Sequence, residues 1–127
     1  MTMAAGLATL AAYKEDGIFE QARTLEGWLQ EGLGAIQKKH SIVGDVRGVG
    51  GFFAVECVKD AKTKEPVVPW QGAGGLGIMK NFYGELRKRG IISFGKYNIA
   101  MVAPPLRPMP ARRPPMSWVT SALMRPL

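Results

Sequence analysis

Two side chains of the sequence could act as a base, a nucleophile or a metal ligand: the only histidine, His40, and the only cysteine, Cys57. One histidine without clustered cysteines or carboxylates cannot build a metal site, so we predict that no metal is bound. We interpret His40 as the polar end of a helix near solvent. Cys57 has no apparent histidine–carboxylate pairing, so we interpret it as a small buried hydrophobic residue.

A glycine-rich segment, GAGGLG at Gly72 to Gly77, satisfies the G-x-G-x-x-G pattern of dinucleotide-binding loops and precedes an expected helix. Its surroundings do not fit that function. Pro66 and Pro69 interrupt the strand that would precede the loop, and no acidic residue lies about 20 residues further on to bind a ribose hydroxyl. No second βαβ unit follows. We therefore interpret the segment as a flexible glycine loop and predict no bound dinucleotide.

Basic residues are concentrated in the last third of the chain. The formal net charge is +7, but no Asp or Glu occurs after Glu85. Residues 86–127 hold 8 Lys and Arg and no acid, whereas residues 1–85 hold 9 basic and 10 acidic residues. Such an asymmetry is typical of a tail that binds nucleic acid or a membrane. No apolar run approaches the roughly 18 residues that span a membrane. The tail also lacks a recognised nucleic-acid motif, which disfavours nucleic acid as a partner. A small basic-tailed module for nucleic-acid binding or protein interaction is the alternative hypothesis.

The first third of the chain reads as two helices of one small domain. A length of 127 residues allows a single modest core. Thr2 can N-cap a helix that ends near Lys14, and Asp16 can cap a second, longer helix. In the second helix apolar residues recur at steps of three and four, which predicts a face directed at the core. This stripe consists of Ile18, Ala22, Leu25, Leu29, Leu33 and Ile36.

The remainder reads as strands around one more helix. A glycine cluster separates two β-prone runs, Val43 to Val49 and Phe52 to Val58, which predicts a hairpin. Both faces of its second strand are largely apolar, so we expect that strand to be central. The order of elements predicts an α+β fold, with a small, largely antiparallel sheet and helices packed on one face. The later elements are a helix at Leu76 to Arg89 and strands at Ile91 to Phe94 and Asn98 to Val102, around a turn at residues 95–97.

Three segments occur in an order that identifies a family. A VGDVRG segment precedes a strand that ends in Glu56 to Asp60, a K-x-x-E-P turn follows at Lys62 to Pro66, and an APPL segment at Ala103 to Leu106 follows the strand that begins R-G-I-I. Over about residues 3–106 the chain resembles the C-terminal small domain of class III aminotransferases. These enzymes are of fold type I and include ω-amino-acid–pyruvate and 4-aminobutyrate transaminases. The opening MAAGLATLAAY resembles the helix after the family's glycine–histidine–proline turn.

The resemblance implies that the chain is part of a larger enzyme. Such enzymes use pyridoxal 5′-phosphate (PLP) to move an amino group between an amine or ω-amino acid and an oxo acid such as pyruvate. The family's chains are several times longer, and the Schiff-base lysine and the other cofactor-binding residues belong to their large domain. No lysine here matches the lysine motif. We therefore predict no catalytic and no cofactor-binding residue, no PLP on this fragment alone, and no activity by itself.

The resemblance also implies a substrate-binding role for the turn between the last two strands. In the family an arginine near that turn often binds a substrate carboxylate through a bidentate fork. Here the segment reads FGKYN and holds no arginine. We predict that Phe94, Lys96 and Asn98 contact the substrate, with Lys96 supplying a point charge that is not equivalent to an arginine fork. Arg47 is a fourth candidate. The alternatives are a solvent-exposed turn and a structural role for Arg47.

The resemblance ends at Leu106. The family continues with an acidic amphipathic helix, whereas residues 107–127 are rich in Pro and Arg and free of acids. We therefore divide the chain into a partial small domain, residues 1–106, and an atypical tail, residues 107–127, and hypothesise that the tail is disordered or translated out of frame. The expected partners are the missing large domain or a homodimer partner, amine and oxo-acid substrates, and no membrane. The single cysteine fits a cytoplasmic location.

Overall fold

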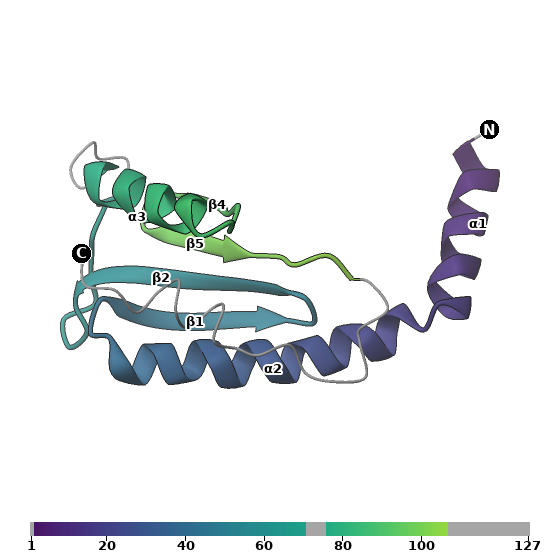
Figure 1. Cartoon of the computed structure of the whole chain (residues 1–127), viewed down its shortest axis with the longest axis horizontal. Coiled ribbons are helices and arrows are strands. Elements are labelled where there is room, and N and C mark those ends of the chain that lie inside the picture. Colours follow the sequence, from purple (N-terminus) through teal and green to yellow (C-terminus); the bar gives the residue numbers. More distant parts are fainter. Residues whose placement is uncertain (1, 71–75, 107–127) are drawn as a thin grey trace.

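The computed structural model describes residues 2–70 and 76–106. Two of its three helices lie on one side of a small antiparallel sheet (Figure 1). The α+β prediction is confirmed. Residues 71–75, which include most of the GAGGLG segment, and the tail at residues 107–127 lie outside the described residues. In chain order the elements are α1 (Thr2–Glu15), α2 (Ile18–Lys39), β1 (Val43–Val49), β2 (Phe52–Asp60), β3 (Glu65–Pro66), α3 (Leu76–Lys88), β4 (Phe94–Lys96) and β5 (Ile99–Val102).

The sheet has the strand order β1-β2-β5-β4, and every pairing is antiparallel. The two-residue strand β3 pairs with the far end of β2, off this path. The predicted hairpin of β1 and β2 is therefore present, and β2 is central because it pairs with β1 on one side and β5 on the other. Pro66 fits only at the short β3, since a proline cannot donate to a ladder.

Glycines shape the hairpin between β1 and β2. Val49 pairs with Phe52, so Gly50 and Gly51 form a two-residue loop, and Gly50 has a φ of 58°, which glycine adopts without strain. A Cβ on Gly48 would lie 2.3 Å from the Phe52 carbonyl oxygen, so that position excludes a side chain. The Gly50 N–H donates to Glu26 Oε2 on α2 at 3.0 Å, which fixes the hairpin loop to the helix.

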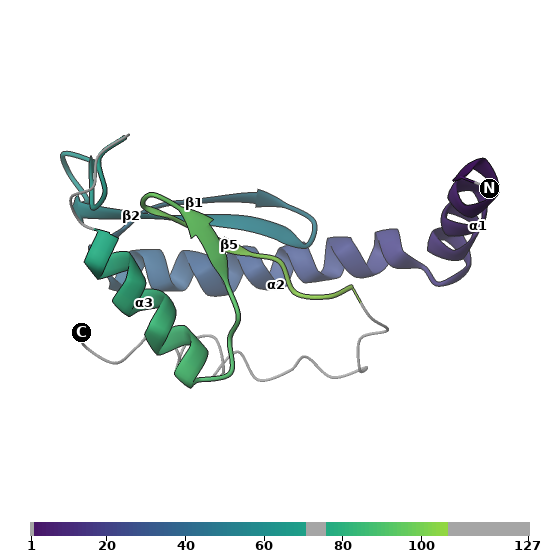
Figure 2. The ribbon, with the colours of Figure 1, turned by 90° about the horizontal axis from the view of Figure 1, so that it is seen from above.

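One face of the sheet, here called the inner face, is covered by α2 and α3. Leu25, Leu29, Leu33 and Ile36 of α2 are buried against Phe53, Val55 and Ala100 of the sheet, as the stripe predicted. Phe82 and Tyr83 of α3 pack against the same cluster, so both helices lie on one side. Figure 2 shows the two helices at an angle to each other. A second cluster under α3 contains Cys57, Val67, Val68 and Met79.

The first helix, α1, stands away from this body (Figure 1). Its large apolar side chains are exposed: Met3 is 83% exposed, Leu7 70% and Leu10 63%. A helix with apolar residues on all sides is normally buried by a partner. The described residues of this chain leave these side chains exposed.

Two local predictions were wrong. Asp16 is not the N-cap of α2; Gly17 holds that position in the left-handed conformation, with no side-chain cap hydrogen bond. The last hairpin is shorter than predicted, because Ile91 to Ser93 are not in a strand and Lys96 pairs with Ile99. The loop is therefore Tyr97 and Asn98, with Tyr97 at a φ of 55°. The glycine at residue 95, expected in the turn, lies in β4 and pairs with Ala100. A Cβ there would collide with the Ile99 carbonyl oxygen and the Tyr83 hydroxyl, so the position excludes a side chain.

Candidate functional site

The face of the sheet opposite the helices, here called the outer face, carries three of the four predicted substrate contacts. Side chains alternate along a strand, so residues paired across the sheet share a face. The helices cover Phe53 and Val55, and the residues between and beyond them therefore point to the outer face. Two adjacent cross-strand rows result: Arg47, Ala54, Met101 and Phe94; and Asp45, Glu56, Ile99 and Lys96.

The outer face is open, and exposed apolar side chains lie on it beside its charged residues. Phe94 is 62% exposed and Phe52 48% exposed, and Val49 next to the hairpin loop is 71% exposed. Ala54 and Met101 between them are half-buried. Contiguous exposed apolar side chains of this kind mark a binding surface more often than an ordinary solvent face.

Arg47 is engaged by two carboxylates of the same face. Its Nη1 atom lies 2.5 Å from Asp45 Oδ2 and 3.0 Å from Glu56 Oε2. Hydrogen bonds to Glu56 and Asp45 raise the pKa of the Arg47 guanidinium above its usual value. The charge of this arginine is therefore compensated within the chain, which favours the structural alternative for Arg47 over direct binding of a substrate anion.

Asn98 lies in the loop between β4 and β5 and is buried, with 7% of its surface exposed. Its Nδ2 atom donates to Glu56 Oε1 at 3.1 Å and to the Cys57 carbonyl oxygen at 3.1 Å. The Cys57 N–H in turn donates to the Asn98 carbonyl oxygen at 2.7 Å. These three hydrogen bonds tie the loop to the central strand. The Asn98 amide therefore fixes the loop next to Lys96, the last residue of β4.

Glu56 is a residue of this site that sequence reasoning missed. It accepts hydrogen bonds from both Asn98 and Arg47 and so joins the two candidates into one network. The signal in the sequence was a carboxylate inside an apolar strand run, AVECV. A charged residue at such a position usually has a partner.

Lys96 is exposed at the end of the outer face. Its Nζ atom lies 5.1 Å from the centre of the Tyr97 ring, within the range of a cation–π contact. Tyr97 also packs against Trp70, with ring centres 4.9 Å apart. Among the described residues the structure shows no carboxylate paired with Lys96, so its charge is available to a ligand, in contrast to that of Arg47.

The histidine and the cysteine are not brought into this site. His40 is the C-cap of α2, where its backbone N–H donates to the Ile36 carbonyl oxygen at 2.9 Å. Cys57 is 4% exposed on the inner face, and burial raises the pKa of its thiol to about 11. A thiol held in its neutral form is a poor nucleophile, which confirms the interpretation of Cys57 as a buried hydrophobic residue. Within the described residues no three candidate ligands come together to hold a metal ion.

The described residues do not fit the covalent chemistry of PLP. A Schiff-base lysine has to be desolvated, or close to another cation, to lose its proton near neutral pH. Every lysine of the chain lies within the described residues, and each is exposed.

No helix in residues 2–70 and 76–106 is long and apolar enough to cross a bilayer.

Known proteins match this chain over most of its length. The family model "Aminotransferase class-III" matches residues 1–108. A taurine–pyruvate aminotransferase from Bilophila wadsworthia is 36% identical over 95 residues, which cover 75% of this chain and 21% of the relative. The alanine–glyoxylate aminotransferase 2 homolog 2 of Arabidopsis thaliana is 36% identical over 105 residues, which cover 80% of this chain and 20% of the relative.

A solved structure shares the fold. The taurine:2-oxoglutarate aminotransferase of Bifidobacterium kashiwanohense, in complex with PLP and glutamate, superimposes with a TM-score of 0.80 at 27% identity. The match covers 94% of this chain and 27% of that one. The chain thus spans about a fifth of the length of the curated relatives that it matches. Residues 1–108 make up most of its sequence, so this chain belongs to the class III aminotransferase family.

Proposed function

We propose that this chain supplies the small domain of a PLP-dependent transaminase that moves an amino group between an amine or ω-amino acid and an oxo acid such as pyruvate. Family membership and the names of the matched relatives support this proposal. The observation that carries it is the open outer face of the sheet, where the exposed Phe94 and the uncompensated cation Lys96 are neighbours. The cofactor is held by a large domain of the kind that the longer relatives contain, in the cytoplasm.

The outer face closes over the substrate in this proposal. Phe94 provides an apolar wall, and the Lys96 ammonium attracts an anionic group of the substrate as a point charge. Asn98 fixes the loop next to Lys96 through its hydrogen bonds to Glu56 and Cys57. Arg47 holds Glu56 in place through its ion pair and does not itself receive the substrate.

The partner in this proposal is the large domain, or the other protomer of a homodimer. The exposed apolar side chains of α1 support such a contact, because a helix with this composition is stabilised by burial. By itself the chain has only exposed lysines, so we propose that it is inactive alone. Sequencing of the DNA next to this reading frame tests the arrangement: it is expected to encode a large domain with the Schiff-base lysine, and to give an acidic amphipathic helix in another frame over residues 107–127.

A chimera tests the function directly. Residues 3–106 replace the matched segment of the taurine–pyruvate aminotransferase from Bilophila wadsworthia, and amino transfer to pyruvate is measured together with the absorbance of bound PLP. We expect the chimera to bind PLP and transfer an amino group, and the isolated chain to do neither. A folded chimera that binds PLP and transfers no amino group from any amine would contradict the proposal.

Variants of the chimera test the role of the outer face. Lys96→Gln removes the uncompensated cation, and we expect KM for anionic amines to rise about tenfold with kcat little changed, since a hydrogen bond to a charged group contributes about 1.5–3 kcal/mol. The matched control is Lys38→Gln, an exposed lysine at the end of α2 on the other side of the molecule. Equal KM and kcat values for the two variants would show that Lys96 does not bind the substrate.

A further inference from the structure

Two aromatic side chains from different segments of the chain lie beside Lys96. Tyr97 follows Lys96 in the loop between β4 and β5, whereas Trp70 lies beyond β3 and before α3. The centres of the Tyr97 and Trp70 rings are 4.9 Å apart, and the ring planes are inclined at 46°. The Nζ atom of Lys96 lies 5.1 Å from the centre of the Tyr97 ring. Tyr97 is therefore the middle member of this group, in contact with both Trp70 and Lys96.

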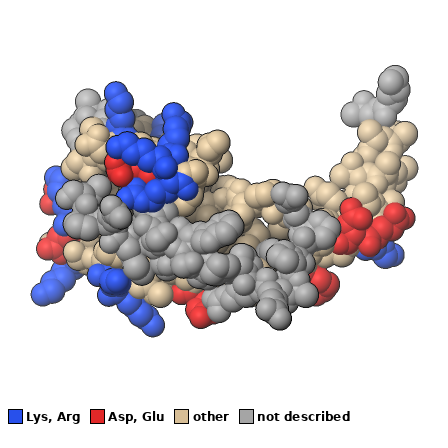
Figure 3. All heavy atoms as spheres, viewed as in Figure 1, with Lys and Arg blue, Asp and Glu red and all other residues tan. Residues whose placement is uncertain are grey.

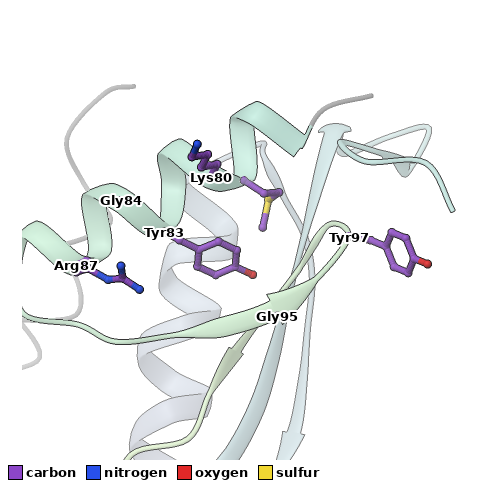
Figure 4. Close-up of a pocket in the computed structure, with 7 residues that line it drawn as sticks. Lys80, Tyr83, Gly84, Arg87, Gly95 and Tyr97 are labelled. Atoms are coloured by element: carbon purple, nitrogen blue, oxygen red, sulfur yellow. The ribbon is translucent and has the colours of Figure 1, made fainter. Parts of the chain in front are cut away.

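The position of the Tyr97 ring is set by the core and by the loop. Its side chain packs against the second core cluster, which contains Cys57, Val67, Val68 and Met79. Its backbone has a φ of 55°, a conformation that residues other than glycine keep only where surrounding contacts determine it. The next residue, Asn98, is fixed by its hydrogen bonds to the central strand. Figure 4 shows the Tyr97 ring projecting from the tip of the hairpin, on the side away from Tyr83.

Lys96 by itself has a long, exposed side chain, and no carboxylate is paired with it among the described residues. A flexible ammonium group loses conformational freedom when it binds an anion, and this loss weakens binding. The face of an aromatic ring attracts an ammonium ion, so the Tyr97 ring restricts the position of the Lys96 charge before a ligand binds. The contact leaves N–H donors available for an anion, because one ring face cannot satisfy every donor of an ammonium group.

Positive charge alone does not orient a ligand in this part of the molecule. In Figure 3 blue side chains gather over α3 around a single small red area. The basic residues of α3 are Lys80, Arg87 and Lys88. Such charges attract an anion over a screening length of about 10 Å without placing it against a particular side chain. A fixed Lys96 ammonium can place it, because Lys96 and Phe94 lie on the same face of β4.

We propose that Trp70 and Tyr97 are positioning residues for the Lys96 ammonium group. Tyr97 holds the ammonium at the end of the outer face, and Trp70 packs against the Tyr97 ring and limits its movement. The anionic group of an amine substrate then binds at a defined distance from the apolar wall of Phe94. Both rings act through Lys96 and not by contact with the substrate. This inference rests on the proposed transaminase function.

The test uses the chimera with the taurine–pyruvate aminotransferase and measures KM and kcat for taurine. Tyr97→Asn removes the ring and introduces a residue that accepts the left-handed backbone conformation. We expect KM to rise about threefold with kcat little changed, the effect of losing a cation–π contact at an exposed site. Tyr97→Phe keeps the ring and is the matched control, with a KM equal to that of the unchanged chimera. Trp70→Leu should raise KM less, about twofold, because the Tyr97 ring remains.

A second series in the Lys96→Gln background separates positioning from a general structural role. Without the ammonium group there is nothing to position, so adding Tyr97→Asn should leave the KM of the Lys96→Gln chimera unchanged. An equal rise in both backgrounds would overturn the inference. An active chimera in which Tyr97→Asn and Tyr97→Phe have the same KM would also overturn it and would leave the proposed function intact. A folded chimera that binds PLP and transfers no amino group from any amine would overturn both.

The contact itself can be measured in the purified chain of 127 residues, without enzymatic activity. Protons above the face of an aromatic ring resonate upfield in NMR spectra, so the ε-protons of Lys96 are expected to be shifted upfield. Tyr97→Phe should retain this shift, and Tyr97→Asn should abolish it. The same ε-proton shift in the unchanged chain and in Tyr97→Asn would show that the ring does not hold the ammonium group, and would overturn the inference.

Discussion

The inner and outer faces of the sheet have the same backbone and differ in what covers them. On β2 the side chains of Phe53 and Phe52 are neighbours in sequence, yet Phe53 is 3% exposed under α2 and Phe52 is 48% exposed. The apolar side chains of the inner face are buried by α2 and α3, whereas the outer face carries exposed apolar side chains and Lys96, which has no carboxylate partner among the described residues. A sheet face that keeps exposed aromatics beside an uncompensated lysine is suited to a ligand or a partner domain, and the predictions below test that difference.

The largest effect is expected at the inner face. Phe53→Ala removes a buried ring from the main core cluster, and such a change costs about 3–5 kcal/mol in the free energy of unfolding. Phe52→Ala, the adjacent residue on the outer face, is expected to cost less than about 1 kcal/mol. Urea denaturation followed by circular dichroism measures both. Equal losses would mean that the outer face is covered in solution.

The second effect is a loss of stability at high pH. Burial raises the pKa of the Cys57 thiol from 9.0 to about 11. The folded chain therefore binds more protons than the unfolded chain between these values, so its stability is intact below pH 9 and falls as the pH rises toward 11, by about 2–3 kcal/mol in total. Chemical denaturation at a series of pH values measures this slope.

Cys57→Ala is the control for that slope. It lacks the thiol, so its stability should change less between pH 9 and 10 than that of the unchanged chain. Burial also raises the pKa of Tyr83, and this contribution remains in the variant at higher pH. The explanation is wrong if the two proteins lose stability in parallel from pH 9 onward.

The third effect concerns the loop between β4 and β5, which contains Asn98. Asn98→Ala removes two hydrogen bonds from a buried amide, to Glu56 and to the Cys57 carbonyl oxygen. We expect a loss of about 1–2 kcal/mol in the free energy of unfolding, because the carbonyl keeps a second donor in Val67 and the carboxylate keeps Arg47. Asn81→Ala, an exposed position on α3, is the matched control and should change stability by less than about 0.5 kcal/mol.

The inner face was predictable from the sequence because its signals are local. The apolar stripe of α2 shows its helical periodicity directly, and the glycines between β1 and β2 show where the chain turns. Boundaries were wrong where a tertiary contact decided them. Gly95 lies in β4 because it pairs with Ala100 of β5, and no local pattern in the sequence shows this pairing.

The site was predicted only as separate residues. The resemblance pointed to Phe94, Lys96, Asn98 and Arg47. The roles of two of them depend on Glu56, which binds Arg47 9 positions before it and Asn98 42 positions after it. Periodicity cannot show such a link, because the strand order β2-β5-β4 is set by the whole fold.

The smallest effect on stability, and the sharpest contrast with Phe53, is expected for Phe94→Ala. The Phe94 ring is 62% exposed on the outer face, so its removal from the isolated chain should change the free energy of unfolding by less than about 0.5 kcal/mol. In the taurine–pyruvate chimera the same substitution removes the proposed apolar wall, and we expect kcat/KM for an apolar amine to fall about tenfold, as one buried side chain contributes about 1–3 kcal/mol. If Phe94 has no ligand, its substitution should change neither the free energy of unfolding nor kcat/KM. If it packs within the chain, the substitution should lower the free energy of unfolding of the isolated chain. Only a residue that contacts a ligand or a second domain leaves the stability of the isolated chain unchanged and lowers kcat/KM of the chimera when it is substituted.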